Sequence, residues 1–184
     1  RGSYKTSVIS QVYPLWQIIR NPNVRILLDS ELLQNSQNNL KVIAGLLERH
    51  ERFRHLFGDY VSKKWTQEYL QVSKRTNLAL RDPTVATGSV ETISVGTHWD
   101  VCIADDIQSE KNSKTKAQIE QVYEHFRLVF GLLEPSASYI VVGTRWADLD
   151  VYGRIMEDHK DFKVLLRSAF HDSGALYFPG RLTH

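Results

Sequence analysis

Val101-Cys102-Ile103-Ala104-Asp105-Asp106 is the most informative segment of this chain. Its four consecutive apolar residues predict a strand that is buried on both faces, as strands of parallel sheets are. The run ends in two adjacent carboxylates. Neighbouring side chains on a strand point to opposite faces, so the pair can share one site only where the strand ends and the backbone turns. The polar segment that follows fits such a turn, and a solvated acidic turn without function is the alternative.

A second informative stretch, Arg1-Gly2-Ser3-Tyr4-Lys5-Thr6-Ser7, opens the chain and leads into a helical pattern. Lysine followed by threonine at a helix start is typical of a phosphate-binding loop, in which backbone N–H groups and the helix dipole hold the anion. Tyr4 stands where glycine is usual and needs an allowed backbone conformation there. A polar tail before a helix is the alternative. Together with Asp105 and Asp106, the stretch predicts a site for ATP and Mg²⁺.

The chemistry of each residue sets its expected role in this site. Lys5 is expected to reach the β and γ phosphates, and Thr6 to place its hydroxyl on Mg²⁺. Asp105 is expected to hold Mg²⁺ through water, and Asp106 to orient or deprotonate the attacking water. Many such ATPases carry glutamate at the second position, so the geometry must compensate for the shorter aspartate.

Size and composition are those of one ordinary globular domain spanning residues 1–184, with 42% hydrophobic and 24% charged residues. The chain has 23 Lys and Arg against 21 Asp and Glu, a net charge of +2. This balance does not predict nucleic-acid binding by bulk electrostatics, so any DNA contact must be local. The single cysteine, Cys102, excludes an internal disulfide and is expected to be a buried thiol. No apolar run approaches the roughly 20 residues of a membrane span, so no membrane partner is expected.

Hydrophobic periodicity predicts alternating helices and strands. Helices are predicted at about 5–19, 40–57 and 119–133. Pro14 should kink or shorten the first, Gly58 should end the second, and Glu134-Pro135-Ser136 should break the third. Strands are predicted at 24–28, 99–104, 139–143 and 162–166, with short antiparallel strands within 65–73 and 84–95. This order predicts an α/β fold in which helices flank a parallel sheet.

Val141-Val142-Gly143-Thr144-Arg145-Trp146 predicts a buried strand that ends in Gly-Thr-Arg. Ligands of open α/β sheets bind at the carboxyl ends of strands. Thr144 is therefore a candidate sensor of the γ-phosphate or the attacking water, and Arg145 a candidate phosphate sensor. Two alternatives stay open: Thr144 caps a helix that begins near Asp148, and Arg145 forms an ion pair with Asp148 or Asp150.

Two further clusters also have structural alternatives. A basic stretch on the second predicted helix is either a DNA contact or a solvated face, the latter being the more common; it comprises His50, Arg52, Arg54 and His55. Four aspartates suggest a two-metal nuclease, although the lysine-bearing loop favours nucleotide; they are Asp100, Asp105, Asp148 and Asp150.

With these residues assembled, the chain resembles the ATPase domain of the tailed-phage terminase large subunit, a DNA-packaging motor. The opening stretch looks like the family's deviant Walker A, with arginine four residues before the lysine. Further likeness is carried by Gly96-Thr97-His98-Trp99-Asp100, by Asn112-Ser113, by Gly143-Thr144-Arg145-Trp146 with Asp148, Tyr152, Gly153 and Arg154, and by Phe178-Pro179-Gly180-Arg181-Leu182. The resemblance spans nearly the whole chain.

The resemblance implies a RecA-like P-loop NTPase fold whose first strand precedes residue 1, so that the chain is an N-terminally clipped piece. By it, Arg1 stabilises the γ-phosphate, Asp105 is the Walker B acid, Asp106 is the catalytic carboxylate and Thr144 is the coupling residue. The implied nucleotide-binding residues are Arg1, Gly2, Ser3, Tyr4, Lys5, Thr6, Ser7 and Arg145, and the metal ligands are Thr6 and Asp105. Arg75 and Arg81 are candidates for an arginine supplied to a neighbouring subunit.

The same resemblance implies partners. They are double-stranded DNA, a portal protein, a small terminase subunit and further copies of the chain in a homo-oligomeric ring, all in the host cytoplasm. A nuclease domain would follow His184. Aspartate at position 106, where glutamate is more usual, departs from the family pattern. Two alternatives stay open: a helicase-type motor ATPase, and a degenerate P-loop domain that binds partners without hydrolysing ATP.

Overall fold

The computed structural model describes residues 4–92, 95–146, 148–168, 173 and 175–176. A five-stranded sheet in the order β2-β3-β1-β4-β5 forms its centre. The strands are β1 (Ile26–Ser30), β2 (Tyr69–Leu70), β3 (Val85–Thr87), β4 (Trp99–Asp105) and β5 (Leu133–Val142). β3, β1, β4 and β5 run parallel, and β2 is antiparallel to β3. The predicted α/β fold, with helices flanking a mostly parallel sheet, is confirmed.

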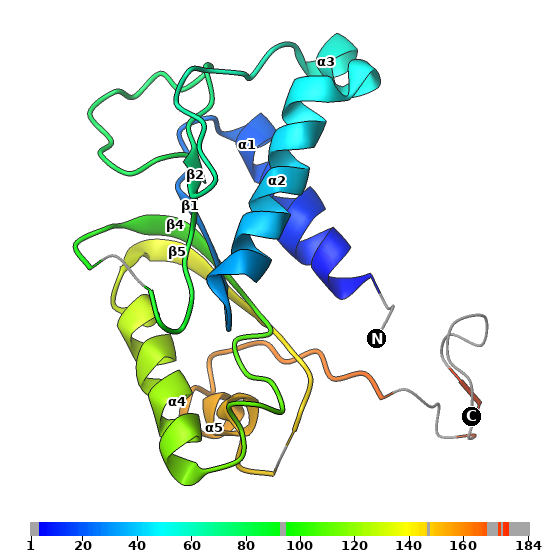
Figure 1. Ribbon diagram of the computed structural model, residues 1–184, viewed down its shortest axis with the longest axis vertical. Coiled ribbons are helices and arrows are strands. Elements are labelled where there is room, and N and C mark those ends of the chain that lie inside the picture. Colours follow the sequence, from blue (N-terminus) through cyan, green and yellow to red (C-terminus); the bar gives the residue numbers. More distant parts are fainter. Residues whose placement is uncertain (1–3, 93–94, 147, 169–172, 174, 177–184) are drawn as a thin grey trace.

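Helices cover both faces of this sheet (Figure 1). In chain order they are the π-helix η1 (Ser7–Val12), α1 (Tyr13–Arg20), α2 (Leu33–Arg49), α3 (Glu51–Phe57), α4 (Lys116–Phe130) and α5 (Val151–Asp158). Side chains alternate along β4, so Val101 and Ile103 pack with α1 and α2. Cys102 and Ala104 pack on the opposite face with α4 and α5.

The strand register brings the functional candidates to one edge of the sheet. Ser30 at the end of β1 pairs with Asp105 at the end of β4, and Asp105 pairs with Val142 at the end of β5. All three strands are parallel, so the segments that follow them emerge side by side. Asp106 and Thr144 therefore lie at the same carboxyl edge.

The first predicted helix is divided by a change of helix type. The π-helix η1 occupies Ser7–Val12, and α1 begins at Tyr13. Pro14 is the second residue of α1, directly after the change from π-helix to α-helix. It has no N–H to donate to the preceding turn, so the helix changes type beside the proline. Short π-helical segments are frequent at functional sites, and this one directly follows Lys5 and Thr6.

The second and third predicted helices also differ from expectation. The second is split into α2 and α3, because His50 has extended backbone (ψ 99°) and caps α3 by accepting a hydrogen bond from Phe53 N. Gly58 ends α3 as predicted, with φ 84°. α4 ends at Phe130, and the predicted breaker 134–136 lies inside β5. β5 is an edge strand of this sheet, and an edge strand tolerates proline because one of its sides makes no ladder hydrogen bonds.

The predicted strand at 162–166 is wrong, because these residues form no strand. Val164, Leu165 and Leu166 are exposed, and an apolar run alone does not supply a neighbouring strand to pair with. The predicted buried thiol is confirmed: Cys102 is fully buried, and burial raises the pKa of the thiol well above its usual range. Among the described helices, none is both long and apolar enough to traverse a bilayer.

A buried polar pair joins the sheet to α4. His125 Nε2 lies 2.7 Å from Asp29 Oδ2, and both side chains are buried beneath the helix. Asp29 Oδ1 has no hydrogen-bond partner in the described part of the chain. The imidazole is therefore the group that compensates burial of this carboxylate.

His125→Leu is expected to lower the free energy of unfolding by about 3 kcal/mol, because it leaves the Asp29 carboxylate buried without its partner. Denaturant-induced unfolding measures this loss. Asp29→Leu in the same chain should restore part of it, since two apolar residues need no hydrogen bond. Glu124→Ala, an exposed change on the same helix, serves as the control. A loss for His125→Leu no larger than that of the control would contradict the assignment.

Candidate functional site

Lys5 reaches the end of β5. Its Nζ donates hydrogen bonds to the Gly143 carbonyl oxygen at 3.1 Å and to Thr144 Oγ1 at 3.3 Å. These bonds join two segments that lie almost 140 residues apart in the chain. The first segment was predicted to bind phosphate and the second to act in coupling. The Lys5 side chain is exposed, so its ammonium group can exchange these partners for ligand oxygens without unpacking the core.

Asp105 is held from two sides at the end of β4. Its Oδ2 accepts a hydrogen bond from Ser10 Oγ at 2.7 Å, and its backbone oxygen accepts one from Ser30 Oγ at 2.7 Å. The residue is 5% exposed, and Oδ1 is buried with no hydrogen-bond partner among the described residues. A buried carboxylate oxygen is costly unless a cation or a water satisfies it. The orphaned oxygen therefore fits a hard cation such as Mg²⁺ or the water bound to one.

Two residues of this edge have left-handed backbone. Tyr4 has φ 57° and Asp106 has φ 50°, and they are the only non-glycine residues with positive φ in the described ranges. Such a conformation costs about 1–3 kcal/mol per residue and is concentrated at functional sites. At Tyr4, it is the conformation that glycine adopts without strain, which accounts for the usual glycine.

The left-handed turn at Asp106 confirms that the chain turns directly after Asp105. Asp106 N donates to the Val142 carbonyl oxygen at 2.8 Å, and its own carbonyl oxygen accepts from Glu31 N at 3.3 Å. Asp105 is buried, whereas Asp106 is exposed at the edge. The two carboxylates thus have the different surroundings that separate roles require.

Arg145 belongs to the loop before α5. Its Nε lies 2.7 Å from Asp150 Oδ1, and its Nη2 donates to the Asp148 carbonyl oxygen at 2.7 Å. The ion-pair alternative for Arg145 is thus confirmed with Asp150. Asp150 also caps α5 by accepting from Gly153 N at 2.8 Å. The capping alternative for Thr144 is therefore wrong.

Tyr152 connects the loop after β5 to the loop after β4. A Cβ atom at Gly143 would lie 2.0 Å from Tyr152 Cζ, so the tyrosine ring needs glycine beneath it. Tyr152 Oη accepts a hydrogen bond from Gln108 N at 3.3 Å, and the fully buried Gln108 accepts one from Val151 N through Oε1 at 2.6 Å. Burial raises the pKa of the Tyr152 hydroxyl well above its usual range, so it stays protonated at neutral pH.

The remaining residues of the opening stretch are placed only in part. Arg1, Gly2 and Ser3 lie outside the described residues. Thr6 precedes η1 with helical backbone, and Ser7 is the first residue of η1. The hydroxyl that contacts Asp105 belongs to Ser10, four residues after Thr6, and no predicted motif includes it. The feature of the sequence that could have pointed to Ser10 is a small polar residue among the apolar residues of the first predicted helix.

The four aspartates of the nuclease alternative do not converge. Asp100 lies at the amino end of β4, about 16 Å along the strand from Asp105. There its carboxylate forms an ion pair with Arg25 at 2.8 Å, and this pairing raises the pKa of the guanidinium. Asp150 is engaged in capping α5. Among the described residues, no group of three or more His, Cys, Asp or Glu is arranged to hold a metal ion.

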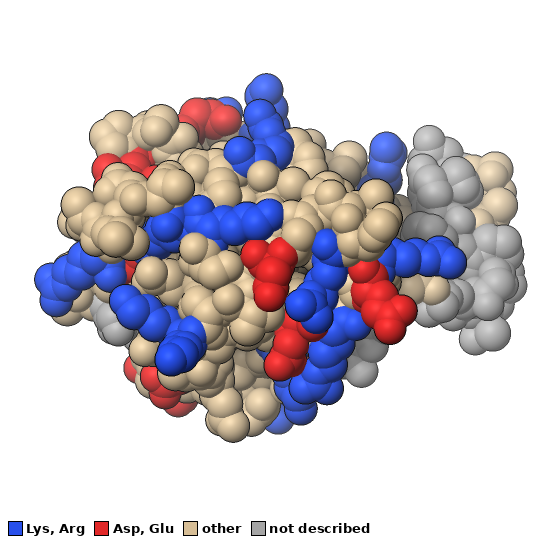
Figure 2. All heavy atoms as spheres, turned by 90° about the horizontal axis from the view of Figure 1, so that it is seen from above, with Lys and Arg blue, Asp and Glu red and all other residues tan. Residues whose placement is uncertain are grey.

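The other basic residues that were considered for contacts with DNA or a neighbouring subunit either bond to residues of this chain or are exposed to solvent. Arg75 is buried and donates to the Asp82 carbonyl oxygen, and burial lowers the pKa of its guanidinium. It is therefore not available to a neighbouring subunit, whereas Arg81 is exposed. Arg54 pairs with Asp59 at 3.4 Å. On the face shown in Figure 2, Lys and Arg side chains are interspersed with Asp and Glu, as on an ordinary solvated surface.

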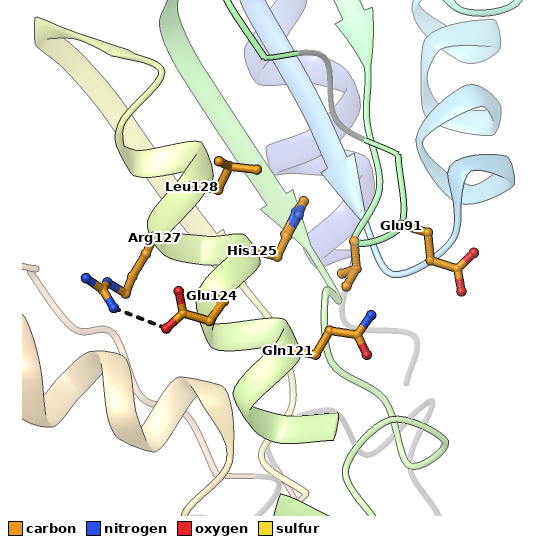
Figure 3. A pocket seen from close by; sticks show the side chains of 7 residues that line it. Glu91, Gln121, Glu124, His125, Arg127 and Leu128 are labelled. Carbon is orange, nitrogen blue, oxygen red and sulfur yellow. Dashed lines mark hydrogen bonds and ion pairs between the residues drawn. The ribbon is translucent and has the colours of Figure 1, made fainter. Parts of the chain in front are cut away.

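A separate hollow of about 570 Å³ lies beside α4. Its lining comprises Val90, Glu91, Gln121, Glu124, His125, Arg127 and Leu128. Figure 3 shows Gln121, His125 and Leu128 directed from α4 toward the segment that carries Glu91. Within this lining, Glu124 and Arg127 pair with each other at 3.1 Å. None of the predicted site residues that the structure describes lines this hollow, so the candidate site is the carboxyl edge of the sheet.

The sequence matches no family model and no curated protein.

Proposed function

We propose that this chain binds ATP with Mg²⁺ at the carboxyl edge of its sheet and hydrolyses it to move double-stranded DNA. The observation that carries the proposal is the contact of Lys5 Nζ with Gly143 O and Thr144 Oγ1, next to the carboxylates that end β4. A cation, a hydroxyl, a buried acid and an exposed acid from three distant segments thus meet where parallel sheets bind ligands. The proposal includes a P-loop NTPase fold of the RecA-like type.

Lys5 supplies the positive charge for the phosphates. An ammonium group donates strongly to phosphate oxygens, so Lys5 exchanges its bonds at the end of β5 for bonds to the β and γ phosphates. The same exchange releases Thr144 Oγ1, which then hydrogen-bonds the γ-phosphate or the attacking water. Occupancy by ATP is in this way sensed at the end of β5.

The two carboxylates have different roles, one in binding the metal ion and the other in activating water. Asp105 Oδ1 and the Thr6 hydroxyl would hold Mg²⁺, which when bound neutralises charge that develops on the phosphates. Asp106 accepts a proton from the attacking water or orients it, since it is exposed at the edge and sits on a left-handed turn.

The coupling of hydrolysis to DNA runs through α5. Thr144 is followed by a loop in which Arg145 pairs with Asp150, the residue that caps α5. Tyr152 of α5 covers Gly143. A change in the bonds of Thr144 is thus transmitted to α5. The resemblance extends the proposal to a DNA-packaging ring that works with a portal protein and a small terminase subunit.

Phosphate release from ATP, measured with double-stranded DNA, single-stranded DNA or neither, tests this function. We expect hydrolysis that requires Mg²⁺ and is stimulated most by double-stranded DNA. Stimulation by single-stranded DNA alone would instead indicate a helicase-type motor. Tight ATP binding without any release of phosphate would indicate a binding module.

Thr144→Val removes the hydroxyl at nearly constant shape. We expect ATP binding to persist and DNA-stimulated hydrolysis to fall by about 10- to 100-fold, the equivalent of a lost hydrogen bond to a charged group of about 1.5–3 kcal/mol. The melting temperature of the same variant should be nearly unchanged, because Asp150 caps α5. A destabilised variant that retains stimulated hydrolysis would contradict the sensing role.

A further inference from the structure

Ser10 places a donor on one oxygen of the Asp105 carboxylate, and we infer that it is a positioning residue that leaves the other oxygen directed at a divalent cation. The inference rests on the proposed function, because it concerns the cation that accompanies ATP. Ser10, a residue of η1, would in this way orient a ligand of the metal ion. The same orientation gives Ser10 a role in the choice of cation.

The geometry fixes the carboxylate at both ends. Ser10 Oγ donates to Oδ2 at 2.7 Å, and Ser30 Oγ donates to the backbone oxygen of the same aspartate at 2.7 Å. Ser10 is 1% exposed and Asp105 is 5% exposed. With Oδ2 bonded and the backbone anchored, the carboxylate cannot rotate freely. Its Oδ1 is buried and has no hydrogen-bond partner among the described residues.

The local fold explains why a serine reaches this position. Tyr13 N bonds to the Val8 carbonyl oxygen, the five-residue spacing of a π-helix, so the turn that carries Ser10 is wider than an α-helical turn. The next residue, Gln11, donates through Nε2 to Asn39 Oδ1 of α2 at 3.0 Å, which ties η1 to the scaffold. A hydroxyl buried in this layer costs free energy unless it is hydrogen-bonded, and Asp105 satisfies it. Ser10 is thus a rigidly held donor.

A carboxylate that is bonded through one oxygen presents only the other to a metal. Mg²⁺ demands near-ideal octahedral geometry and takes carboxylates through single oxygens, whereas Ca²⁺ readily accepts both oxygens of one carboxylate. The bond from Ser10 therefore favours Mg²⁺ and the similar Mn²⁺ over Ca²⁺. Residues that orient metal ligands in this way typically contribute 10- to 100-fold in metal affinity.

Ser10→Ala tests the inference, with Ser30→Ala as the matched control that removes a buried donor to the backbone oxygen of the same aspartate. The readouts are direct binding of Mn²⁺ with a non-hydrolysable ATP analogue, followed by electron paramagnetic resonance, competition by Ca²⁺, and the Mg²⁺ concentration for half-maximal hydrolysis. We expect Ser10→Ala to weaken Mn²⁺ binding and raise the Mg²⁺ requirement by about 10-fold. Ca²⁺ should compete better, and kcat at saturating Mg²⁺ should be nearly retained.

Ser30→Ala should leave the preference between Mg²⁺ and Ca²⁺ unchanged. If Ser10→Ala does not fold, the nearly isosteric Ser10→Cys, whose thiol is a weak donor, should show an intermediate shift in the same direction. Unchanged metal preference in a folded Ser10 variant, or an equal shift in Ser30→Ala, would overturn the inference.

The failure of the inference and that of the proposed function are distinguishable. If the unmodified protein hydrolyses ATP with Mg²⁺, if Asp105→Asn removes this requirement or the activity, and if Ser10→Ala behaves as the unmodified protein, then only the role of Ser10 is overturned. If the unmodified protein binds no cation with nucleotide, both are overturned.

Discussion

Lys5→Ala is expected to lower ATP hydrolysis by about 10²- to 10³-fold and to leave the domain folded. The Lys5 ammonium group lies at the carboxyl edge and donates to Gly143 O, directly after β5. Removing one preorganised donor to a charged transition state typically lowers the rate by about 10²- to 10³-fold. The side chain is exposed and its two bonds are to the edge of the sheet, so the core does not depend on it. Steady-state phosphate release and thermal melting of the same preparation measure the two effects.

Lys63→Ala is the matched control for this variant, because Lys63 is also an exposed lysine and lies in the loop between α3 and β2. It should hydrolyse ATP at the unmodified rate. An unchanged turnover for Lys5→Ala would exclude the phosphate-binding role. Loss of activity accompanied by unfolding would show that the bonds from Lys5 to Gly143 and Thr144 are structural instead.

Asp106→Asn is expected to keep binding ATP with Mg²⁺ and to lose turnover by about 10²-fold or more, as removal of a general base does. Asp106 is exposed and sits on a left-handed turn, a conformation that asparagine tolerates well, so the substitution should preserve the backbone. Nucleotide affinity and single-turnover rates, measured on the same variant, separate binding from chemistry.

Asp105→Asn provides the comparison for the two carboxylates. It replaces the buried acid that accepts from Ser10, so it should weaken Mg²⁺-dependent binding of nucleotide. If Asp106→Asn abolished binding while Asp105→Asn left it intact, the two roles would be the reverse of those proposed.

The layers of the fold could be predicted from the sequence because buried positions recur along helices and strands with a regular spacing of apolar residues. The apolar run at 101–104 and the helical stripe that forms α4 both have the predicted type, and their register brings Asp105 to the carboxyl edge. The boundaries were less predictable. An apolar run such as 162–166 forms a strand only if tertiary structure places another strand beside it. The residues of the run itself carry no information on that neighbour.

The candidate site could be predicted where the chemistry lies in short motifs. Lys5 and Thr144 were singled out separately, and the structure brings them into contact. Ser10 and Tyr152 could not be assigned roles in the same way, because their importance arises from a π-helical turn and from a glycine beneath an aromatic ring. Such contacts depend on packing between elements distant in the chain, and a periodic pattern carries no information on them.

A crystal structure of the protein with Mg²⁺ and a non-hydrolysable ATP analogue would show directly whether nucleotide binds at the carboxyl edge. We expect the Lys5 ammonium group to leave Gly143 and Thr144 for the β and γ phosphates, and the cation or its bound water to lie on Asp105 Oδ1. Thr144 Oγ1 should then face the γ-phosphate or a water beside it. A nucleotide bound elsewhere, for example in the hollow beside α4, with Lys5 still bonded to Gly143, would exclude the carboxyl edge as the nucleotide site.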